Sequence, residues 1–162
     1  MRKASLSFMA LVLAIAFIGC PYTSDVPFDS PSMRIDNRLL GKWYTSNNPQ
    51  KNASYHIVSK KSAREYKIVE YTWNSSQKKF TEKVYGGWLS KLRRNTFLTV
   101  KTNNNKYVFN KLASVSGTTV RIDQVTDNVR EKFNSPAKLK AFIMKNMHLS
   151  FFYEKSKNYY KK

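Results

Sequence analysis

The side chains that could do chemistry in this chain are few and widely spaced. Cys20 is the only cysteine in 162 residues, and the two histidines, His56 and His148, lie far apart in the sequence. Zinc sites need several Cys, His or carboxylate ligands at short spacings, and the sequence has no such pattern, no nucleophile motif and no phosphate-binding glycine loop. Asp123 and Asp127 could exchange protons, but basic residues nearby make surface ion pairs the simpler interpretation. We therefore expect no metal, no cofactor and no enzymatic activity.

Cys20 ends an N-terminal segment that has the layout of a secretory signal. Arg2 and Lys3 precede an apolar run, and no acidic residue occurs before the cysteine. The run is too short for a permanent transmembrane helix, which needs about 20 apolar residues. The segment Phe17-Ile18-Gly19-Cys20 resembles the lipobox of bacterial lipoproteins, with Phe17 where that family usually has leucine.

This resemblance implies that residues 1–19 are a lipoprotein signal peptide and that Cys20 carries the lipid. Two or more acyl chains would hold the protein on a membrane, since each buried methylene contributes about 0.8 kcal/mol. Pro21 stands where some inner-membrane lipoproteins have aspartate, so we expect a lipid anchor in the bacterial cell envelope, with the outer membrane favoured. The alternative is a secreted protein with one unpaired thiol.

The chain is strongly basic, with 29 Lys and Arg against 10 Asp and Glu and a formal net charge of +19. Such an excess attracts anionic surfaces through a field that salt screens. The partner this indicates is an anionic envelope component, such as a lipid head group or a glycan, and export argues against nucleic acid. The alternative is that the lysines only keep the protein soluble.

Two regions follow the signal. Residues 20–37 are rich in proline, serine and aspartate and have no regular periodicity, so we expect a lipidated tether. Residues 38–162 have the length of a single domain. Short runs of Tyr, Ile and Val between turn signals predict an antiparallel β-meander in this region. A helix is predicted over residues 136–147, and residues 149–162 predict a last strand followed by a frayed basic tail.

Gly41-Lys42-Trp43 opens the first predicted strand of this meander. With the late helix and the strand after it, this motif makes residues 38–155 resemble a lipocalin, or calycin, domain. The resemblance implies a mainly β fold, a small antiparallel up-and-down β-barrel with one C-terminal helix. In lipocalins the tryptophan plugs the closed end of the barrel and an arginine packs over it, a role that Arg121 or Arg130 could fill here.

The interior of a small barrel is either filled by side chains or left hollow for a ligand. If it is hollow, the protein would be a carrier for a small apolar or amphipathic molecule, and a basic rim would favour a carboxylate or phosphate head group. If it is solid, the protein would instead dock on anionic glycan, lipid or a partner protein through its basic surface. Seven aromatic residues of the predicted strands are candidates for a ligand-binding wall: Tyr66, Tyr71, Trp73, Tyr85, Trp88, Tyr107 and Phe109.

Overall fold

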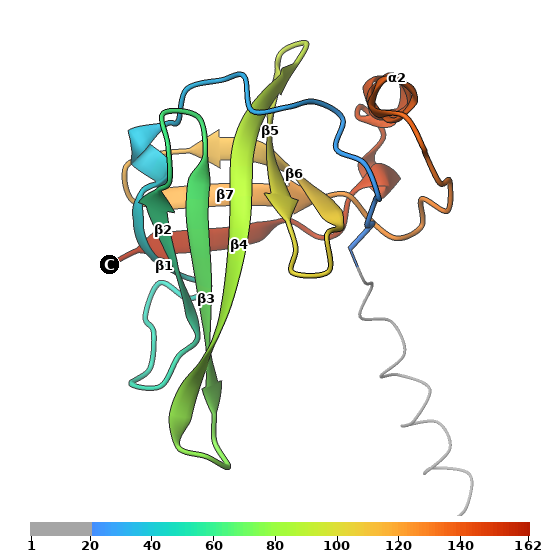
Figure 1. Cartoon of the computed structure of the whole chain (residues 1–162). Coiled ribbons are helices and arrows are strands. Elements are labelled where there is room, and N and C mark those ends of the chain that lie inside the picture. The colour runs from blue at the N-terminus through green and yellow to red at the C-terminus, as the bar shows by residue number, and fades with distance from the viewer. Residues whose placement is uncertain (1–20) are drawn as a thin grey trace, which may run out of the picture.

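The computed structural model describes residues 21–162, in which eight antiparallel strands close into one barrel (Figure 1). Each strand pairs with its neighbours in sequence, and β8 pairs with β1. This confirms the predicted up-and-down β-barrel with a C-terminal helix, while residues 1–19, predicted to be a signal peptide, and Cys20 lie outside the described residues. The strands are β1 Gly41–Tyr44, β2 Tyr55–Lys60, β3 Tyr66–Asn74, β4 Lys79–Leu92, β5 Asn95–Lys101, β6 Tyr107–Val115, β7 Thr119–Gln124 and β8 Lys157–Lys161.

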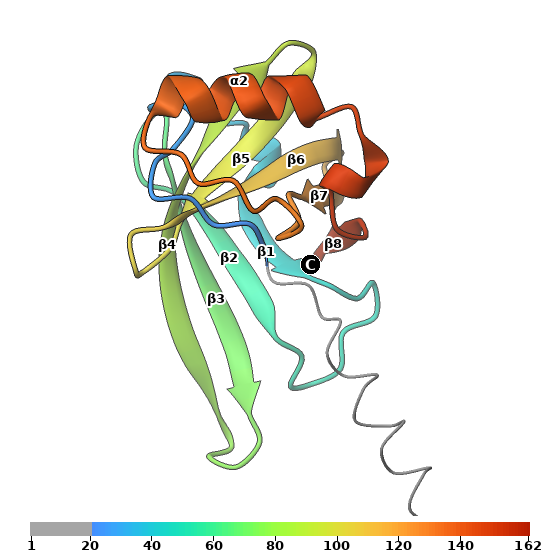
Figure 2. The ribbon, with the colours of Figure 1, turned by 90° about the vertical axis from the view of Figure 1, so that its right-hand side faces the viewer.

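The α-helix of the described region, α2 (Pro136–Asn146), begins where the sequence predicts it. Ser135 stands at the N-cap in extended conformation, and Pro136 has the fixed φ that suits the first helical position. Figure 2 shows α2 lying along the outside of the barrel, over β5 and β6. Among residues 21–162, no helix has the length and hydropathy needed to cross a membrane.

Successive side chains of each strand point to opposite faces of the barrel wall, and this alternation separates two apolar regions. The interior region contains Trp43, Tyr66 and Ile68. The second region, which we call the outer layer, contains Phe97 and Phe109 of β5 and β6 together with α2. The same strands therefore supply one face to the interior and the other to the helix.

The segment 21–37, expected to be a tether, packs on the barrel instead. Pro21 forms a β-bridge with Thr126, and Ser24 forms one with Tyr107. Phe28 is only 2% exposed in the outer layer, where its ring lies 5.0 Å from that of Phe109. Apolar residues among the prolines and serines thus fix this segment against β6 and the outer layer.

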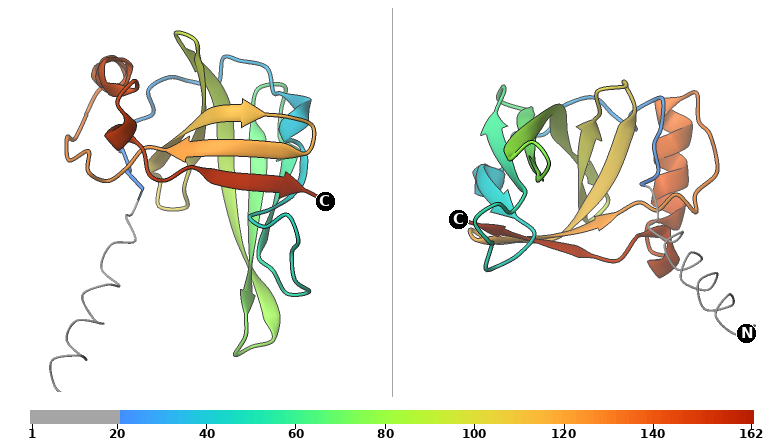
Figure 3. Two further views of the ribbon diagram at one scale, coloured as in Figure 1. Left: turned by 180° about the vertical axis from the view of Figure 1, so that it is seen from behind. Right: turned by 90° about the horizontal axis from the view of Figure 1, so that it is seen from below.

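The C-terminal end also differs from expectation. Residues Ser150–Phe152 form a short 3-10 helix, η2, where a strand was predicted, and the expected basic tail is β8. Because β8 pairs with both β7 and β1, it closes the barrel. Figure 3 shows the C-terminus at the same end of the barrel as the 3-10 helix η1 (Asn37–Leu39), with α2 on the far side.

Candidate ligand-binding site

A cavity of about 390 Å³ lies inside the barrel. Ligand pockets range from about 300 to 1,000 Å³, so this cavity suits a small molecule. Most of the side chains in its wall are apolar, and they come from β2, β3, β5, β6 and β7: Val58, Ile68, Val100, Val108, Val120 and Ile122.

Trp43 forms the wall of the cavity at the end where η1 lies. Its side chain is 3% exposed, and its indole Nε1 donates a hydrogen bond of 2.8 Å to the carbonyl of Leu39. At the same end, the Tyr66 hydroxyl donates to the carbonyl of Asp36 at 3.2 Å and accepts from the backbone N–H of Asp36 at 2.6 Å. These bonds fix η1 and the preceding chain across this end of the barrel.

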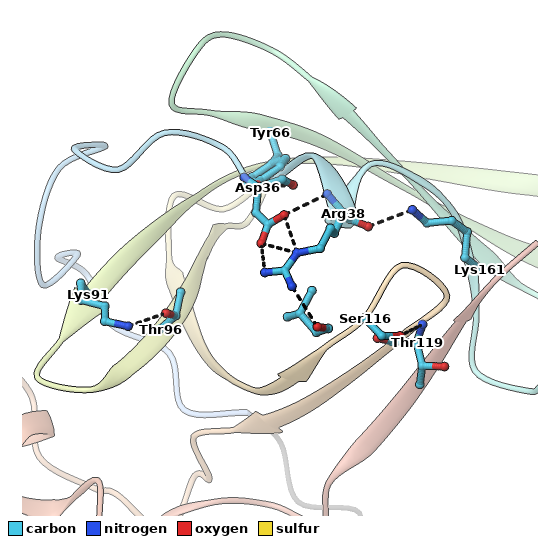
Figure 4. A network of polar contacts seen from close by, with 9 residues as sticks. Asp36, Arg38, Tyr66, Lys91, Thr96, Ser116, Thr119 and Lys161 are labelled. Carbon is cyan, nitrogen blue, oxygen red and sulfur yellow. Dashed lines mark hydrogen bonds and ion pairs between the residues drawn. The ribbon is translucent and has the colours of Figure 1, made fainter.

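A lysine, rather than either of the two expected arginines, covers the indole of Trp43. The Lys161 ammonium lies 4.9 Å from the ring centroid. It also donates a hydrogen bond of 2.8 Å to the carbonyl of Arg38, which Figure 4 shows. Arg121 and Arg130 are exposed. Lys161 fills this position because β8 runs beside β1, with Trp43 and Lys161 as paired residues.

Gly41 is required at the start of β1 for two reasons. Its φ is +129°, a conformation that side-chain-bearing residues rarely adopt. A Cβ at this position would also lie 3.3 Å from Cε of Lys161. The glycine of the Gly-x-Trp motif thus allows the backbone turn and leaves room for the lysine over Trp43.

The polar part of the cavity wall is centred on Glu70. Its Oε2 accepts a 2.9 Å hydrogen bond from the Tyr85 hydroxyl, and its Oε1 lies 3.9 Å from Nε2 of His56. The His56 ring packs edge-on against Tyr159, with 5.7 Å between centroids. Glu70 and His56 keep side-chain exposures of 31% and 28% although they face the interior, so the cavity is open to solvent on this side.

Burial sets the protonation states around Glu70. It lowers the pKa of the His56 imidazole, an effect that the nearby carboxylate only partly offsets. Nδ1 of His56 is buried without a hydrogen-bond partner in the described chain, which disfavours a second N–H there. Burial raises the pKa of Tyr85 to about 12, and it also raises the pKa of Tyr159. At neutral pH His56 is therefore uncharged, and both tyrosines keep their protons.

Of the seven predicted wall residues, the structure places Tyr66 and Tyr85 on the cavity. The other five do not line it, because their side chains point to the outer face of the barrel wall. Tyr71 and Trp73 are an odd number of positions from Tyr66 and lie on the outer face of β3, with Tyr71 stacked on Tyr55 at 4.7 Å. The remaining three lie under α2 and the N-terminal segment: Trp88, Tyr107 and Phe109.

Neither Glu70 nor His56 was predicted as a site residue from the sequence. A signal for Glu70 was present, since Tyr66, Ile68 and Glu70 share one face of β3 and an acidic residue interrupts that apolar face. His56 became recognisable only through the register, which pairs it with Trp43 on one side and Glu70 on the other.

The arrangement offers an apolar chamber with one carboxylate and phenolic hydrogen-bond donors, which suits binding of a small molecule with one polar end. No protein-family model matches this chain, and neither the curated proteins nor the solved structures searched contain a match.

Proposed function

We propose that this protein is a lipid-anchored, lipocalin-like carrier whose barrel binds a small apolar or amphipathic molecule. The observation that carries the proposal is the cavity of about 390 Å³, which is largely apolar and lies inside a closed barrel. Side chains usually fill a protein interior almost completely, so a space of this size has to be held open by the wall around it. An open, largely apolar space of this kind is what a ligand-binding barrel requires.

Features of the closed end support the lipocalin-like assignment. Trp43 of the Gly-x-Trp motif points into the barrel, next to η1. A cationic side chain covers the indole, as the resemblance implies, although Lys161 takes the place of the arginine.

The start of the described chain supports an anchor close to the cavity. Pro21 is part of the cavity wall and bridges to Thr126, just beyond the end of β7. Cys20 is bonded directly to Pro21, so a lipid on this cysteine would attach beside the cavity and hold it near the bilayer. An amphipathic ligand could then pass between membrane and barrel over a short distance.

Cys20→Ser tests the anchor. The wild-type protein should fractionate with membranes, and the variant should move to the soluble or precursor pool because no thiol remains to receive lipid. Fractionation of the wild type with soluble proteins would contradict lipid anchoring while leaving the carrier proposal open to its own test.

Val100→Phe tests the carrier, because it places a larger side chain into the cavity. The matched control is Val84→Phe, at a valine that is 47% exposed on the outer face of β4. Binding of the neutral fluorescent probe N-phenyl-1-naphthylamine should weaken at least about tenfold in Val100→Phe, since a filled pocket forfeits the buried apolar area of the ligand. It should be unchanged in Val84→Phe. Failure of the wild type to bind the probe, or equal binding by both variants, would refute the carrier.

A further inference from the structure

We infer that the polar end of the ligand is a protonated amine that pairs with Glu70, an inference that rests on the proposed carrier function. The carboxylate is part of the cavity wall, and its side chain is 31% exposed. A ligand that fills the cavity would therefore cover this carboxylate and remove it from water. A carboxylate taken out of water needs a partner, because an unpaired buried charge is costly.

The hydrogen bonds made by Glu70 leave most of its acceptor capacity unused. Oε2 accepts from the Tyr85 hydroxyl, but the nearest atom of His56 is 3.9 Å from Oε1, which is beyond hydrogen-bond distance. An ionised carboxylate has about four acceptor sites. Oε1 is thus available to a donor on the ligand.

Among the described residues, no lysine or arginine forms an ion pair with Glu70. Of the described residues that line the cavity, none is Lys or Arg, and Glu70 is the only acid. His56 is neutral at pH 7 because burial lowers its pKa. Lys157 reaches the cavity edge at Gln124, 3.4 Å away, but its ammonium lies equally close to the carboxylate of Glu154.

An ammonium group fits these requirements better than the head groups suggested by the basic surface. It brings a positive charge and three N–H donors, and charge-assisted hydrogen bonds are about twice as strong as neutral ones. A carboxylate or phosphate would meet a like charge at Glu70. The interior therefore favours a cationic head group, whereas the basic exterior attracts anions. At physiological salt the field of the exterior charges is screened over distances beyond about 8 Å, so it has little effect inside the cavity.

Three probes with the same ten-carbon chain test this inference: decylamine, 1-decanol and decanoate, each used below its aggregation concentration. Displacement of N-phenyl-1-naphthylamine from the purified protein gives their relative affinities. Decylamine should bind roughly tenfold or more tightly than the other two, which is the range for a hydrogen bond to a charged group. Glu70→Gln should bring decylamine down to the level of decanol, and a far-UV circular dichroism spectrum matching that of the wild type shows that the variant is folded.

Glu82→Gln is the matched control, because Glu82 lies on the exposed outer face of β4 in the same hairpin. It should keep the preference for the amine. Equal binding of decanoate and decylamine by the wild type, or an amine preference that survives Glu70→Gln, would overturn the inference while decanol binding still supported the carrier. Binding of none of the three probes would overturn both.

Discussion

The barrel interior and the outer layer under α2 are built on opposite faces of the same strands, yet only one of them is filled. In β5 and β6, Phe97 and Phe109 point outward and are fully buried beneath α2. Their neighbours Leu98 and Val108 point inward to the cavity. In these two strands, large aromatic residues pack the outer layer, while smaller aliphatic residues face the cavity. Packing outside the barrel therefore stabilises the wall and leaves the interior hollow.

The two regions should differ most in the loss of unfolding free energy when a side chain of the barrel wall is truncated. Phe109→Ala should lower the free energy of unfolding by about 3–5 kcal/mol, because it opens a hole in a packed region. Val108→Ala, on the other face of the same strand, should cost only about 1–2 kcal/mol, since its side chain already borders a cavity. Urea unfolding measures both. Equal losses at the two positions would break the distinction between a packed outer layer and a hollow interior.

Gly41→Ala tests the packing at the end of the interior where Trp43 lies. The substitution forces a side chain into a backbone with φ of +129° and towards Lys161, so it should cost about 1–3 kcal/mol. Gly117→Ala is the control, because a Cβ there would meet nothing within 4 Å. Its effect should stay within about 0.5 kcal/mol. Similar thermal stabilities for the two variants would show that the Gly-x-Trp turn is not under the constraint described above.

The smallest expected effect is the contribution of His56, in the barrel interior, to the pH dependence of the free energy of unfolding. The folded pKa of His56 is lowered, so the unfolded state binds its proton first as the pH falls. The contribution of His56 is complete above its unfolded pKa of about 6.5 and is lost as the pH drops towards the folded value. Unfolding free energies measured between pH 8 and pH 5 should decline less in His56→Gln than in the wild type. Parallel declines would mean that His56 is not held neutral in the folded protein.

The strands and α2 were predictable because their signals are local. Alternating Tyr, Ile and Val between turn residues predict β2 to β7, and Ser135-Pro136 marks the start of the helix. β8 was hidden because its lysines resemble a solvated tail, and only barrel closure gives Tyr159 an interior to face.

The site was predictable only in part, because the candidate wall residues were chosen as aromatic residues of strands, without knowing which face of the strand each side chain occupies. Tyr66 and Tyr71 look alike in sequence but are five positions apart, which puts them on opposite faces of β3. Phe28 could not be assigned to a core from its proline-rich surroundings, because its partners Phe97 and Phe109 come together only once β5 and β6 have paired. Phase and pairing are tertiary properties, and they decide which aromatics line the cavity.

Ligand binding inside the barrel can be tested by titrating the protein with N-phenyl-1-naphthylamine and recording methyl NMR spectra of labelled Val, Leu and Ile residues. If the interior binds the probe, chemical-shift changes should be confined to inward-facing methyl groups such as those of Val58, Val100 and Val120. Methyl groups of Leu139 and Ile143, which are buried in the outer layer, should not shift. Shifts centred on the outer layer, or none at saturating probe, would contradict a ligand-binding barrel.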